Sequence, residues 1–468
     1  MPRTKIVCTL GPACDAPDVL RDMVRAGMDV ARINFSHGDH ASHARRIADA
    51  RRVAQEEGRT VAILCDLQGP KLRVGEIAGG AVELPPDGTV TLTTRAAPGD
   101  PREVHLPHPD LVADVQPGQR LLLDDGALEL CVESKTDTDL VCRVIVGGRL
   151  GSHKGVSAPG AALSLSSLTE KDRADAMFAL DQQADYLALS FVRRAADVDE
   201  LRVLLASRGA RIPIVAKIEK AEALAEFDDI LATTDAVMVA RGDLGVETPA
   251  ERVPIQQKRI LRACNRAGKP AITATQMLQS MIDSPRPTRA EASDVANAVL
   301  DGTDAVMLSG ETATGHYPVE AVKTMESVAT IAEQNMDCEE WLRRVGPGTS
   351  PSEAIARATV EIAMELKVSA IITSTVSGHT ARMVARYRPG VPVLAATPDP
   401  AVCRQMALVW GVAPLLVPEY TSTDEMIAYT TRAACEAGLV KPGDRVALTA
   451  GIPAGGGGRT NMLKIHTI

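Results

Sequence analysis

The 468-residue sequence has no run of about 18 consecutive apolar residues, so it contains no candidate membrane-spanning helix. It has no excess of basic residues either, because 51 lysines and arginines against 60 aspartates and glutamates leave a formal charge of −9. General nucleic-acid binding usually depends on a basic surface and is therefore disfavoured. Any phosphate that the protein handles must be held by a local basic site.

Cysteine patterns that would indicate a disulfide framework or a zinc site are also missing. The nine cysteines are scattered, with no CxxC and no metal-ligand spacing of cysteine and histidine, which indicates reduced thiols. The first residues enter a strand-like segment at once, without the pattern of a signal peptide. These features predict a cytoplasmic protein.

Apolar residues make up 45% of the chain and charged residues 24%, as in ordinary folded proteins, and the length predicts several domains. Short apolar runs recur, most of them followed by a helical pattern such as 221–231. The runs lie at 5–10, 30–36, 61–67, 186–191, 214–219, 236–240, 271–275 and 305–309. Eight strand–helix units predict a (β/α)₈ TIM barrel of the α/β class, with its chemistry at the C-terminal ends of the strands.

An insertion interrupts the barrel pattern after the third strand. Residues 71–168 are rich in turns and short strand-like runs, which predicts an inserted all-β lid domain. The barrel would then comprise residues 1–70 and 169–340, close to the ~250 residues typical of the fold. Residues 346–468 alternate strand and helix patterns and predict a C-terminal α/β domain. Capping boxes are predicted at Ser167 and at Ser350, each before a helix.

Charged residues at predicted strand ends carry the functional signal. In the strand 214–219, Lys217 and Glu219 point to one side, although a structural salt bridge explains this segment alone equally well. The next strand runs into residues 241–245, Arg-Gly-Asp-Leu-Gly, which brings Asp243 to the same mouth. Two carboxylates with room for water and phosphate suit Mg²⁺, and the glycines allow backbone N–H groups to approach an anion.

Two arginines extend this basic site. Arg32 and Arg73 lie near the ends of the second and third predicted strands, and their forked donors suit phosphoryl oxygens. Each arginine alone would more often be a solvated surface residue. Together with Lys217, they predict a basic floor inside an acidic protein.

Six segments, in order along the chain, resemble the signatures of pyruvate kinase. They are 31–38 (ARINFSHG), 217–219 (KIE), 238–245 (MVARGDLG), 274–278 (ATQML), 285–291 (PRPTRAE) and 307–312 (MLSGET). The resemblance covers essentially the whole chain, including the lid and the C-terminal domain. It implies transfer of the phosphoryl group of phosphoenolpyruvate to ADP, giving pyruvate and ATP in the final step of glycolysis.

The resemblance also implies roles for single residues. Lys217 would stabilise the transferring phosphoryl group and act with Arg32 and Thr275 as catalytic residues, while Glu219 and Asp243 would hold Mg²⁺, or Mn²⁺ in its place. The proton for the enolate would come from Thr275 or from a water near it. Phosphoenolpyruvate would contact Arg32, Lys217, Gly242, Asp243 and Thr275. The nucleotide would contact Asn34, Phe35, Ser36, His37, Arg73 and Lys154.

One departure from the commoner family pattern concerns K⁺. Members that need K⁺ bind it with oxygens at the positions of Asn34, Ser36, Asp66 and the backbone of Leu67. They carry Thr, Lys and Glu where this chain has Leu67, Gln68 and Lys71. The ammonium of Lys71 would supply the same charge, so we predict that K⁺ is not required. The alternative is that Lys71 is a solvated hinge residue.

The C-terminal domain carries a weaker signal. Ser377, Gly378, His379 and Thr380 follow a predicted strand and precede a helix, a geometry able to bind phosphate. Similar positions in the family bind a phosphorylated activator, and four glycines at 455–458 would lie near them. The activator stays open, because Val376 replaces a lysine found in some sugar-bisphosphate-activated relatives. The resemblance further implies a homotetramer.

Two other functions are consistent with parts of the sequence. A metal-dependent barrel aldolase or lyase would share the carboxylates, but it would not need ADP to release pyruvate. A non-catalytic sensor would share the C-terminal domain. Intact Lys217, Glu219, Asp243 and Thr275 disfavour the sensor.

Overall fold

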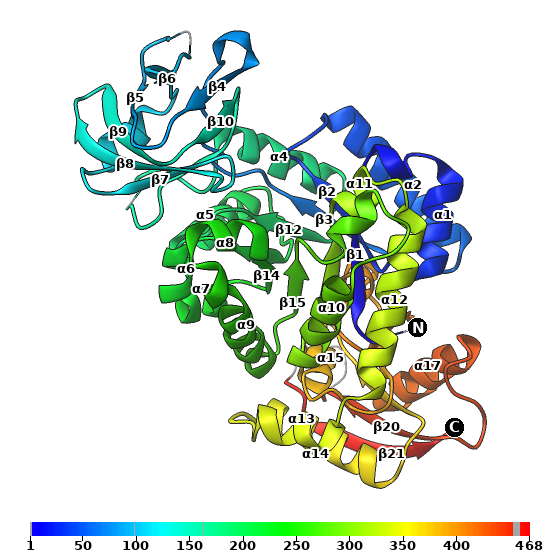
Figure 1. The fold of residues 1–468 in the computed structure, drawn as a ribbon. Helices are drawn as coiled ribbons and strands as arrows, with labels where there is room; N and C mark the ends of the chain where they lie inside the picture. Colours follow the sequence, from blue (N-terminus) through cyan, green and yellow to red (C-terminus); the bar gives the residue numbers. More distant parts are fainter. Residues whose placement is uncertain (1, 98, 162, 453–458) are drawn as a thin grey trace.

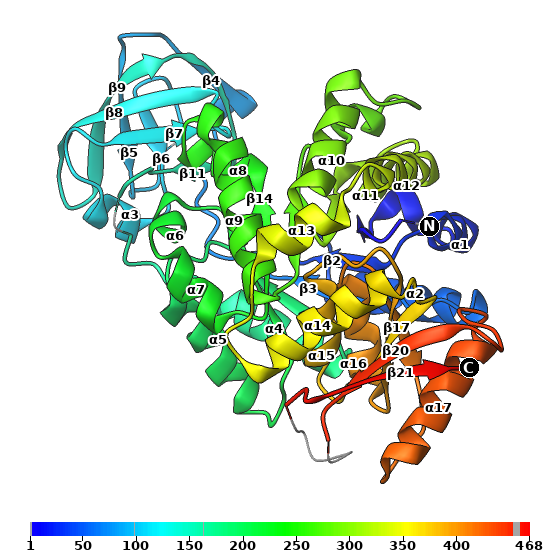
Figure 2. The same cartoon turned by 90° about the horizontal axis from the view of Figure 1, so that it is seen from below.

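The structure is a computed structural model that describes residues 2–97, 99–161, 163–452 and 459–468. Figure 1 shows a central barrel with a β domain above it and an α/β domain below it. The view from below in Figure 2 also places these two domains on opposite sides of the barrel. The predicted fold class is therefore confirmed.

Eight parallel strands form a closed barrel in the order β1-β16-β15-β14-β13-β12-β3-β2. Their bounds are β1 Lys5–Thr9, β2 Val30–Asn34, β3 Ala62–Asp66, β12 Tyr186–Leu189, β13 Ile214–Ile218, β14 Ala236–Ala240, β15 Ala271–Ala274 and β16 Ala305–Leu308. Side chains such as Leu64, Val215 and Ile272 fill the interior, so the barrel is a packed core and not a pore. Because both faces of each strand are buried, the strands read as apolar runs in the sequence.

Helices surround the barrel. They are α1 Pro17–Ala26, α2 His40–Glu56, α4 Glu170–Asp181, α5 Ala195–Ala206, α6 Ala221–Ala225, α7 Phe227–Thr233, α8 Arg241–Glu247, α9 Val253–Ala267, α10 Arg289–Asp301, α11 Gly310–Ala313 and α12 Pro318–Gln334, with short 3₁₀ turns η1 Pro12–Cys14, η3 Ala250–Arg252 and η4 Gln279–Ile282. The single helix predicted over 221–231 is two helices, which meet at Glu226. Ser167 does not cap α4. Thr169 is the N-cap, and Asp172 completes the capping box.

The lid domain is inserted between β3 and α4. Its elements are η2 Ala78–Gly80, β4 Ala81–Leu84, β5 Thr89–Thr93, β6 Glu103–His105, α3 Pro109–Asp114, β7 Arg120–Leu123, β8 Leu128–Lys135, β9 Asp139–Val146, β10 Gly148–Gly151 and β11 Val156–Ser157. They form a six-stranded sheet, β11-β7-β8-β9-β5-β6, and a two-stranded sheet, β10-β4. The lid has its own apolar core, which includes Leu92, Leu121 and Leu130.

The C-terminal domain is a five-stranded sheet of order β19-β18-β17-β20-β21, with β21 antiparallel. Its elements are α13 Cys338–Val345, α14 Pro351–Glu365, β17 Ala370–Ser374, α15 His379–Ala385, β18 Val393–Thr397, α16 Pro400–Gln405, η5 Met406–Leu408, β19 Val412–Leu416, α17 Thr423–Glu436, β20 Arg445–Ala450 and β21 Met462–Thr467. Ser350 caps α14 with Glu353, as predicted.

The C-terminal domain closes the lower end of the barrel. Leu408 of η5 packs in the same interior cluster as Leu64 and Val215. The Arg404 guanidinium pairs with Asp185 at 2.7 Å, immediately before β12. None of the helices in the described part of the chain has the length and apolar character needed to cross a bilayer.

Candidate active site

Charged side chains gather where the barrel strands end. Arg32 on β2 is 8% exposed, and its Nε donates to the Asp66 carboxylate on β3 at 2.7 Å. Its Nη1 donates to the hydroxyl of Thr9 on β1 at 2.9 Å. Because three neighbouring strands fix the guanidinium, its position is set before any ligand arrives.

Lys217 lies beside this pair. Its Nζ donates to Ser190 Oγ at 2.7 Å and is 2.9 Å from Glu219 Oε1 and 3.2 Å from Asp66 Oδ1. Burial by itself lowers the pKa of Lys217, but the Asp66 and Glu219 carboxylates outweigh burial and raise that pKa. Burial likewise raises the pKa of Asp66, whereas Lys217 and Arg32 bring it below its usual value. Lys217 and Asp66 are therefore both ionised, and the ammonium lies close to the carboxylates of Asp66 and Glu219.

A second acidic group faces Glu219. The amide of Phe191 donates to Glu219 Oε2 at 2.7 Å and fixes this carboxylate. Burial and then the charge of Glu219 raise the pKa of Asp243 to about 6. Among the described residues, no group of three or more His, Cys, Asp or Glu side chains is placed to hold a metal. Glu219 and Asp243 present two carboxylates at the mouth, and carboxylate oxygens are ligands that Mg²⁺ accepts.

Thr275 follows β15 in an unusual backbone conformation. Its φ is 67° and that of Gln276 is 54°, in the left-handed region that side chains other than glycine rarely adopt. Thr275 Oγ1 donates to the carbonyl of Ala274 at 2.6 Å and accepts from the amide of Gly242 at 2.8 Å. The hydroxyl is thereby tied to the first turn of α8, which also carries Asp243. The 241–245 segment is thus helical rather than a simple turn.

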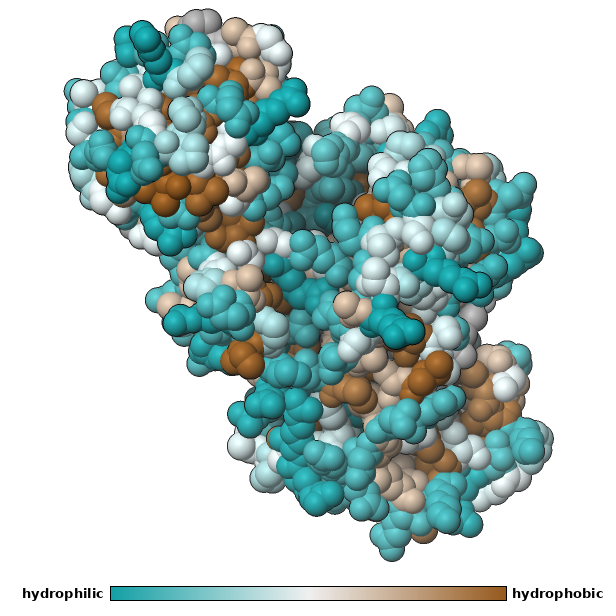
Figure 3. All heavy atoms as spheres, in the orientation of Figure 1, coloured by the Kyte–Doolittle hydropathy of each residue, from teal (hydrophilic) through white to brown (hydrophobic). Residues whose placement is uncertain are grey.

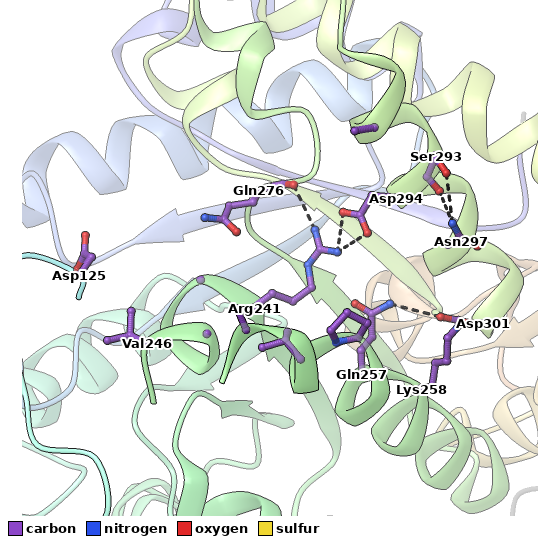
Figure 4. A pocket seen from close by; sticks show the side chains of 16 residues that line it. Asp125, Arg241, Val246, Gln257, Lys258, Gln276, Ser293, Asp294, Asn297 and Asp301 are labelled. Carbon is purple, nitrogen blue, oxygen red and sulfur yellow. Dashed lines mark hydrogen bonds and ion pairs between the residues drawn. The ribbon is translucent and has the colours of Figure 1, made fainter. Parts of the chain in front are cut away.

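Arg241 holds this conformation in place. Its Nη2 donates to the Thr275 carbonyl at 2.7 Å, and its Nη1 donates to Asp294 Oδ1 on α10 at 2.8 Å. Figure 4 shows the guanidinium pointing from α8 toward Asp294, with Gln276 beside it. These residues line a groove of about 830 Å³ that runs from the mouth between α9 and α10.

The lid approaches the mouth from the other side. A narrow cleft of about 60 Å³ is lined by Lys71, Asp125, Phe191 and Asp243, which come from the hinge, the lid and two barrel strand ends. Figure 3 shows the surface hollowed where the lid meets the barrel. The carboxylate of Asp125 contributes to the raised pKa of Asp243, so lid and barrel charges interact across the cleft.

The predicted nucleotide-contacting residues fall into two groups. In the first, at the end of β2, Asn34 Oδ1 accepts from the amide of Ser36 at 3.1 Å, and His37 is exposed. The ring of Phe35 is buried against His43 and Phe178, so only its backbone faces this edge. Its carbonyl accepts from Lys171 Nζ at 2.7 Å.

The second group lies at the base of the lid. Arg73 Nη1 donates to the carbonyl of His153 at 2.6 Å, and Lys154 pairs with Asp124 at 2.8 Å. No hydrogen bond or ion pair between described residues joins Arg73 or Lys154 to residues 34–37. The two groups therefore stay separate in the described structure, one at the end of β2 and the other at the base of the lid.

The residues of the predicted cation site are adjacent in the structure. Asp66 pairs with Arg32 and Lys217, the side chain of Leu67 is buried, and its carbonyl accepts from Ser190 Oγ at 2.7 Å. Lys71 is exposed, and its ammonium has no hydrogen bond or ion pair within the described ranges.

The predicted effector segment connects β17 to α15. Gly378 caps α15 with φ of 75°, and an added Cβ would come within 2.3 Å of Met406 Cε. Ser377 and His379 are exposed, whereas Thr380 is buried and its hydroxyl is 2.8 Å from that of Thr460. The glycines at 455–458 lie outside the described residues.

Sequence reasoning missed several residues of this site. Ser190 and Phe191 come directly after the buried strand β12. Arg241 and Asp294 contribute to the site by holding the backbone of Thr275 in place. Lys171 is one of several charged residues at the start of α4. No local signal distinguishes these side chains, because the partners that hold them in the site lie between 27 and 136 positions away in sequence.

Comparison with known families gives two matches that together span most of the chain. A family described as pyruvate kinase, barrel domain, matches residues 1–322. A family described as pyruvate kinase, alpha/beta domain, matches residues 353–466.

Individual proteins give the same result. The chain is 50% identical to a pyruvate kinase of Geobacillus stearothermophilus over 471 aligned residues, which cover 100% of this chain and 80% of the relative. It is 44% identical to a pyruvate kinase of Clostridium acetobutylicum, with 100% of both chains covered. A crystal structure of a pyruvate kinase from Cryptosporidium parvum matches with a TM-score of 0.94 at 38% identity, covering 100% of this chain and 96% of that chain.

Proposed function

The chain belongs to the pyruvate kinase family, and we propose that it transfers the phosphoryl group of phosphoenolpyruvate to ADP, giving pyruvate and ATP. The observation that carries this proposal is the preformed cluster of Arg32, Lys217, Glu219 and Asp243 at the mouth of the barrel. Phosphoryl transfer needs positioned charge more than covalent catalysis, and this cluster supplies both signs of charge.

Arg32 and Lys217 would contact the transferring phosphoryl group. Arg32 is held by Asp66 and Thr9, so its guanidinium needs little reorganisation to bind phosphoryl oxygens. The raised pKa of Lys217 keeps it charged throughout the working range of pH. Its three partners would hold the ammonium against the transferring group, where charge develops in the transition state.

Glu219 and Asp243 fit a divalent cation. The charge of Glu219 adds to the burial that raises the pKa of Asp243, and a cation between the two carboxylates would relieve that repulsion. Mg²⁺, or Mn²⁺ in its place, would polarise the phosphoryl and enolate oxygens. Gly242 would add a backbone N–H group for the substrate.

Thr275 would lie near the carbon of the enolate that gains a proton, because its hydroxyl is tied to Gly242 in the turn that carries Asp243. A hydroxyl that donates to the Ala274 carbonyl is a poor acid alone, so we assign proton delivery to a water held by Thr275. Closure of the lid over the mouth would exclude bulk water and limit hydrolysis.

The K⁺-independent subtype is part of this proposal. The hinge ammonium of Lys71 is not neutralised by any hydrogen bond or ion pair within the described residues, and its charge lowers the pKa of Asp243, although burial and Glu219 still raise it overall. This contribution supports a role for the charge of Lys71 at the catalytic mouth. Leu67 offers no side-chain oxygen for a monovalent cation.

The remaining assignments follow the family. ADP would contact Asn34, Ser36, His37, Arg73 and Lys154 together with the backbone of Phe35. A phosphorylated activator would bind residues 377–380, and the enzyme would work as a homotetramer.

A coupled assay tests the main proposal. Pyruvate release from phosphoenolpyruvate is followed through lactate dehydrogenase, with and without ADP, at fixed Mg²⁺. We expect turnover only with ADP and the divalent cation present. Release of pyruvate without ADP would favour a lyase or a phosphatase and would refute the proposal.

A further inference from the structure

A buried ion pair lies directly beside the two residues assigned to the divalent cation. Lys220 follows Glu219 in the sequence, and Glu247 lies one turn after Asp243 in α8. Lys220 Nζ donates to Glu247 Oε1 at 2.5 Å, and the two side chains are 11% and 4% exposed. Lysine and glutamate are rarely buried to this extent unless they are paired, and burying such a pair is costly. The position of the pair therefore calls for an explanation other than stability.

The pair joins two segments that the barrel sheet does not hold together. Parallel pairing of β13 with β14 ends at Ile218 and Val239, before Glu219 and before the start of α8. Among the side chains that the structure describes, the contact of Lys220 with Glu247 is the only hydrogen bond or ion pair between residues 219–220 and α8. This contact therefore fixes α8 against the end of β13.

Helix α8 is attached at both of its ends. At its start, the Gly242 amide donates to Thr275 Oγ1 at 2.8 Å, and Arg241 donates to the Thr275 carbonyl at 2.7 Å. At its last residue, Glu247 accepts from Lys220. Asp243 lies between these two attachments, so the direction of its carboxylate depends on both.

Lys220 also supports Glu219 from a second direction. Its Nζ lies 5.6 Å from the centroid of the Phe191 ring, and the Phe191 amide donates to Glu219 Oε2 at 2.7 Å. The φ of Phe191 is 54°, in the left-handed region that a bulky side chain rarely adopts, so its contacts must hold it there. Lys220 thus contacts the residue that fixes one carboxylate and the helix that carries the other.

We propose that Lys220 and Glu247 are positioning residues for the divalent cation, because their ion pair sets the separation of the Glu219 and Asp243 carboxylates before the cation binds. This inference rests on the proposed function of the same site. The charge of Glu219 contributes to the raised pKa of Asp243, so the two carboxylates repel each other without a cation. The ion pair opposes that repulsion, and the cation then meets ligands that are already in place.

The charge of Lys220 alone would have the opposite effect on cation binding. A neighbouring ammonium repels a cation, and a neighbouring carboxylate attracts it. If Lys220 acted only through its charge, removing the ammonium would strengthen cation binding, and removing both charges would leave the affinity near that of the wild type. If Lys220 acts through its link to α8, both changes weaken cation binding.

Mn²⁺ binding to the full-length protein without phosphoenolpyruvate or ADP, measured by electron paramagnetic resonance, tests the inference. Lys220→Met should weaken Mn²⁺ binding by about tenfold or more, an effect typical of residues that support metal ligands. The double variant Lys220→Met with Glu247→Gln should be weakened as much, and it leaves no unpaired buried charge to destabilise the fold. Arg202→Met breaks a pair with Asp235, which lies at the opposite end of β14. This matched control should bind Mn²⁺ as the wild type does.

Thermal unfolding of the same variants without metal separates positioning from a purely structural role. A pair that only stabilises the fold would lower the melting temperature and leave the Mn²⁺ affinity unchanged, and that result would overturn the inference. Tighter Mn²⁺ binding by Lys220→Met, or wild-type affinity in the double variant, would also overturn it. Asp243→Ala is measured alongside. If Asp243→Ala alone loses affinity, the metal site and the proposed phosphoryl transfer stand while this inference fails; if Asp243→Ala binds Mn²⁺ normally, the metal lies elsewhere and both fail.

Discussion

Replacing Arg241 by lysine is expected to slow the chemical step while leaving the barrel folded. Thr275 and Gln276 both have a positive φ, which costs about 1–3 kcal/mol each, and the Arg241 guanidinium holds them through the Thr275 carbonyl at 2.7 Å. A lysine cannot bond this carbonyl and Asp294 together. Loss of one charged hydrogen bond, about 2 kcal/mol, corresponds to a roughly thirtyfold lower kcat if it is expressed fully in the transition state.

Steady-state kinetics with the lactate-dehydrogenase couple measure this effect. The KM for phosphoenolpyruvate should also rise, since the Gly242 amide bonds the Thr275 hydroxyl at 2.8 Å. Arg259→Lys, an exposed position on α9, is the control and should behave as the wild type. A folded Arg241→Lys enzyme with kcat within twofold of the wild type would refute the argument that this guanidinium positions Thr275.

Three further predictions concern ions. Asp243→Ala should sharply raise the Mg²⁺ concentration that gives half-maximal activity, because one of two anionic ligands is lost; an unchanged titration would place the metal elsewhere. The pKa of Asp243 is raised to about 6 without metal, so protons should compete with Mg²⁺ below that pH. The affinity for Mg²⁺ should fall roughly tenfold for each unit of pH below about 6 and be constant above it. Mg²⁺ titrations that overlay at pH 5 and pH 7 would contradict this. Turnover of the wild type should be equal in tetramethylammonium and in potassium at constant ionic strength. The triple variant Leu67→Thr, Gln68→Lys and Lys71→Glu should require K⁺. Strong activation of the wild type by K⁺ would refute the role of Lys71.

The barrel was predictable because its strands are short apolar runs buried on both faces. The strand 214–218 also showed its functional side, since Val215 and Lys217 alternate with residues that face the outer helices. Charged side chains at the ends of such buried strands are hard to explain by packing. For this reason the sequence indicated Lys217 and Asp243 as candidate site residues.

Features that depend on tertiary context could not be read from the sequence. Glu226 divides one helical pattern into α6 and α7 without a proline or glycine to mark the break. Ser167 has the spacing of a cap, yet its hydroxyl donates to the carbonyl of Phe191 and Thr169 takes its place. Helix α13 spans the predicted end of the barrel at residue 340, where the sequence analysis predicted no element.

The ion pairs and hydrogen bonds within the site could not be predicted from the sequence either. Asp66 entered the sequence analysis only as a cation ligand, whereas in the structure it pairs with both Arg32 and Lys217. Ser190 bonds Lys217 from a strand end 27 positions away. Such contacts arise from the closure of the barrel and not from any local pattern.

The proposed phosphoryl transfer depends most on the charge of Lys217, which the substitution Lys217→Met removes. The measurement is kcat for phosphoryl transfer, taken together with Mn²⁺ binding to the same variant. Removing a preorganised charge at the transferring group should lower kcat by about 10³-fold or more, while Glu219 and Asp243 still bind the metal. A variant that binds Mn²⁺ and turns over within about tenfold of the wild type would contradict the assignment.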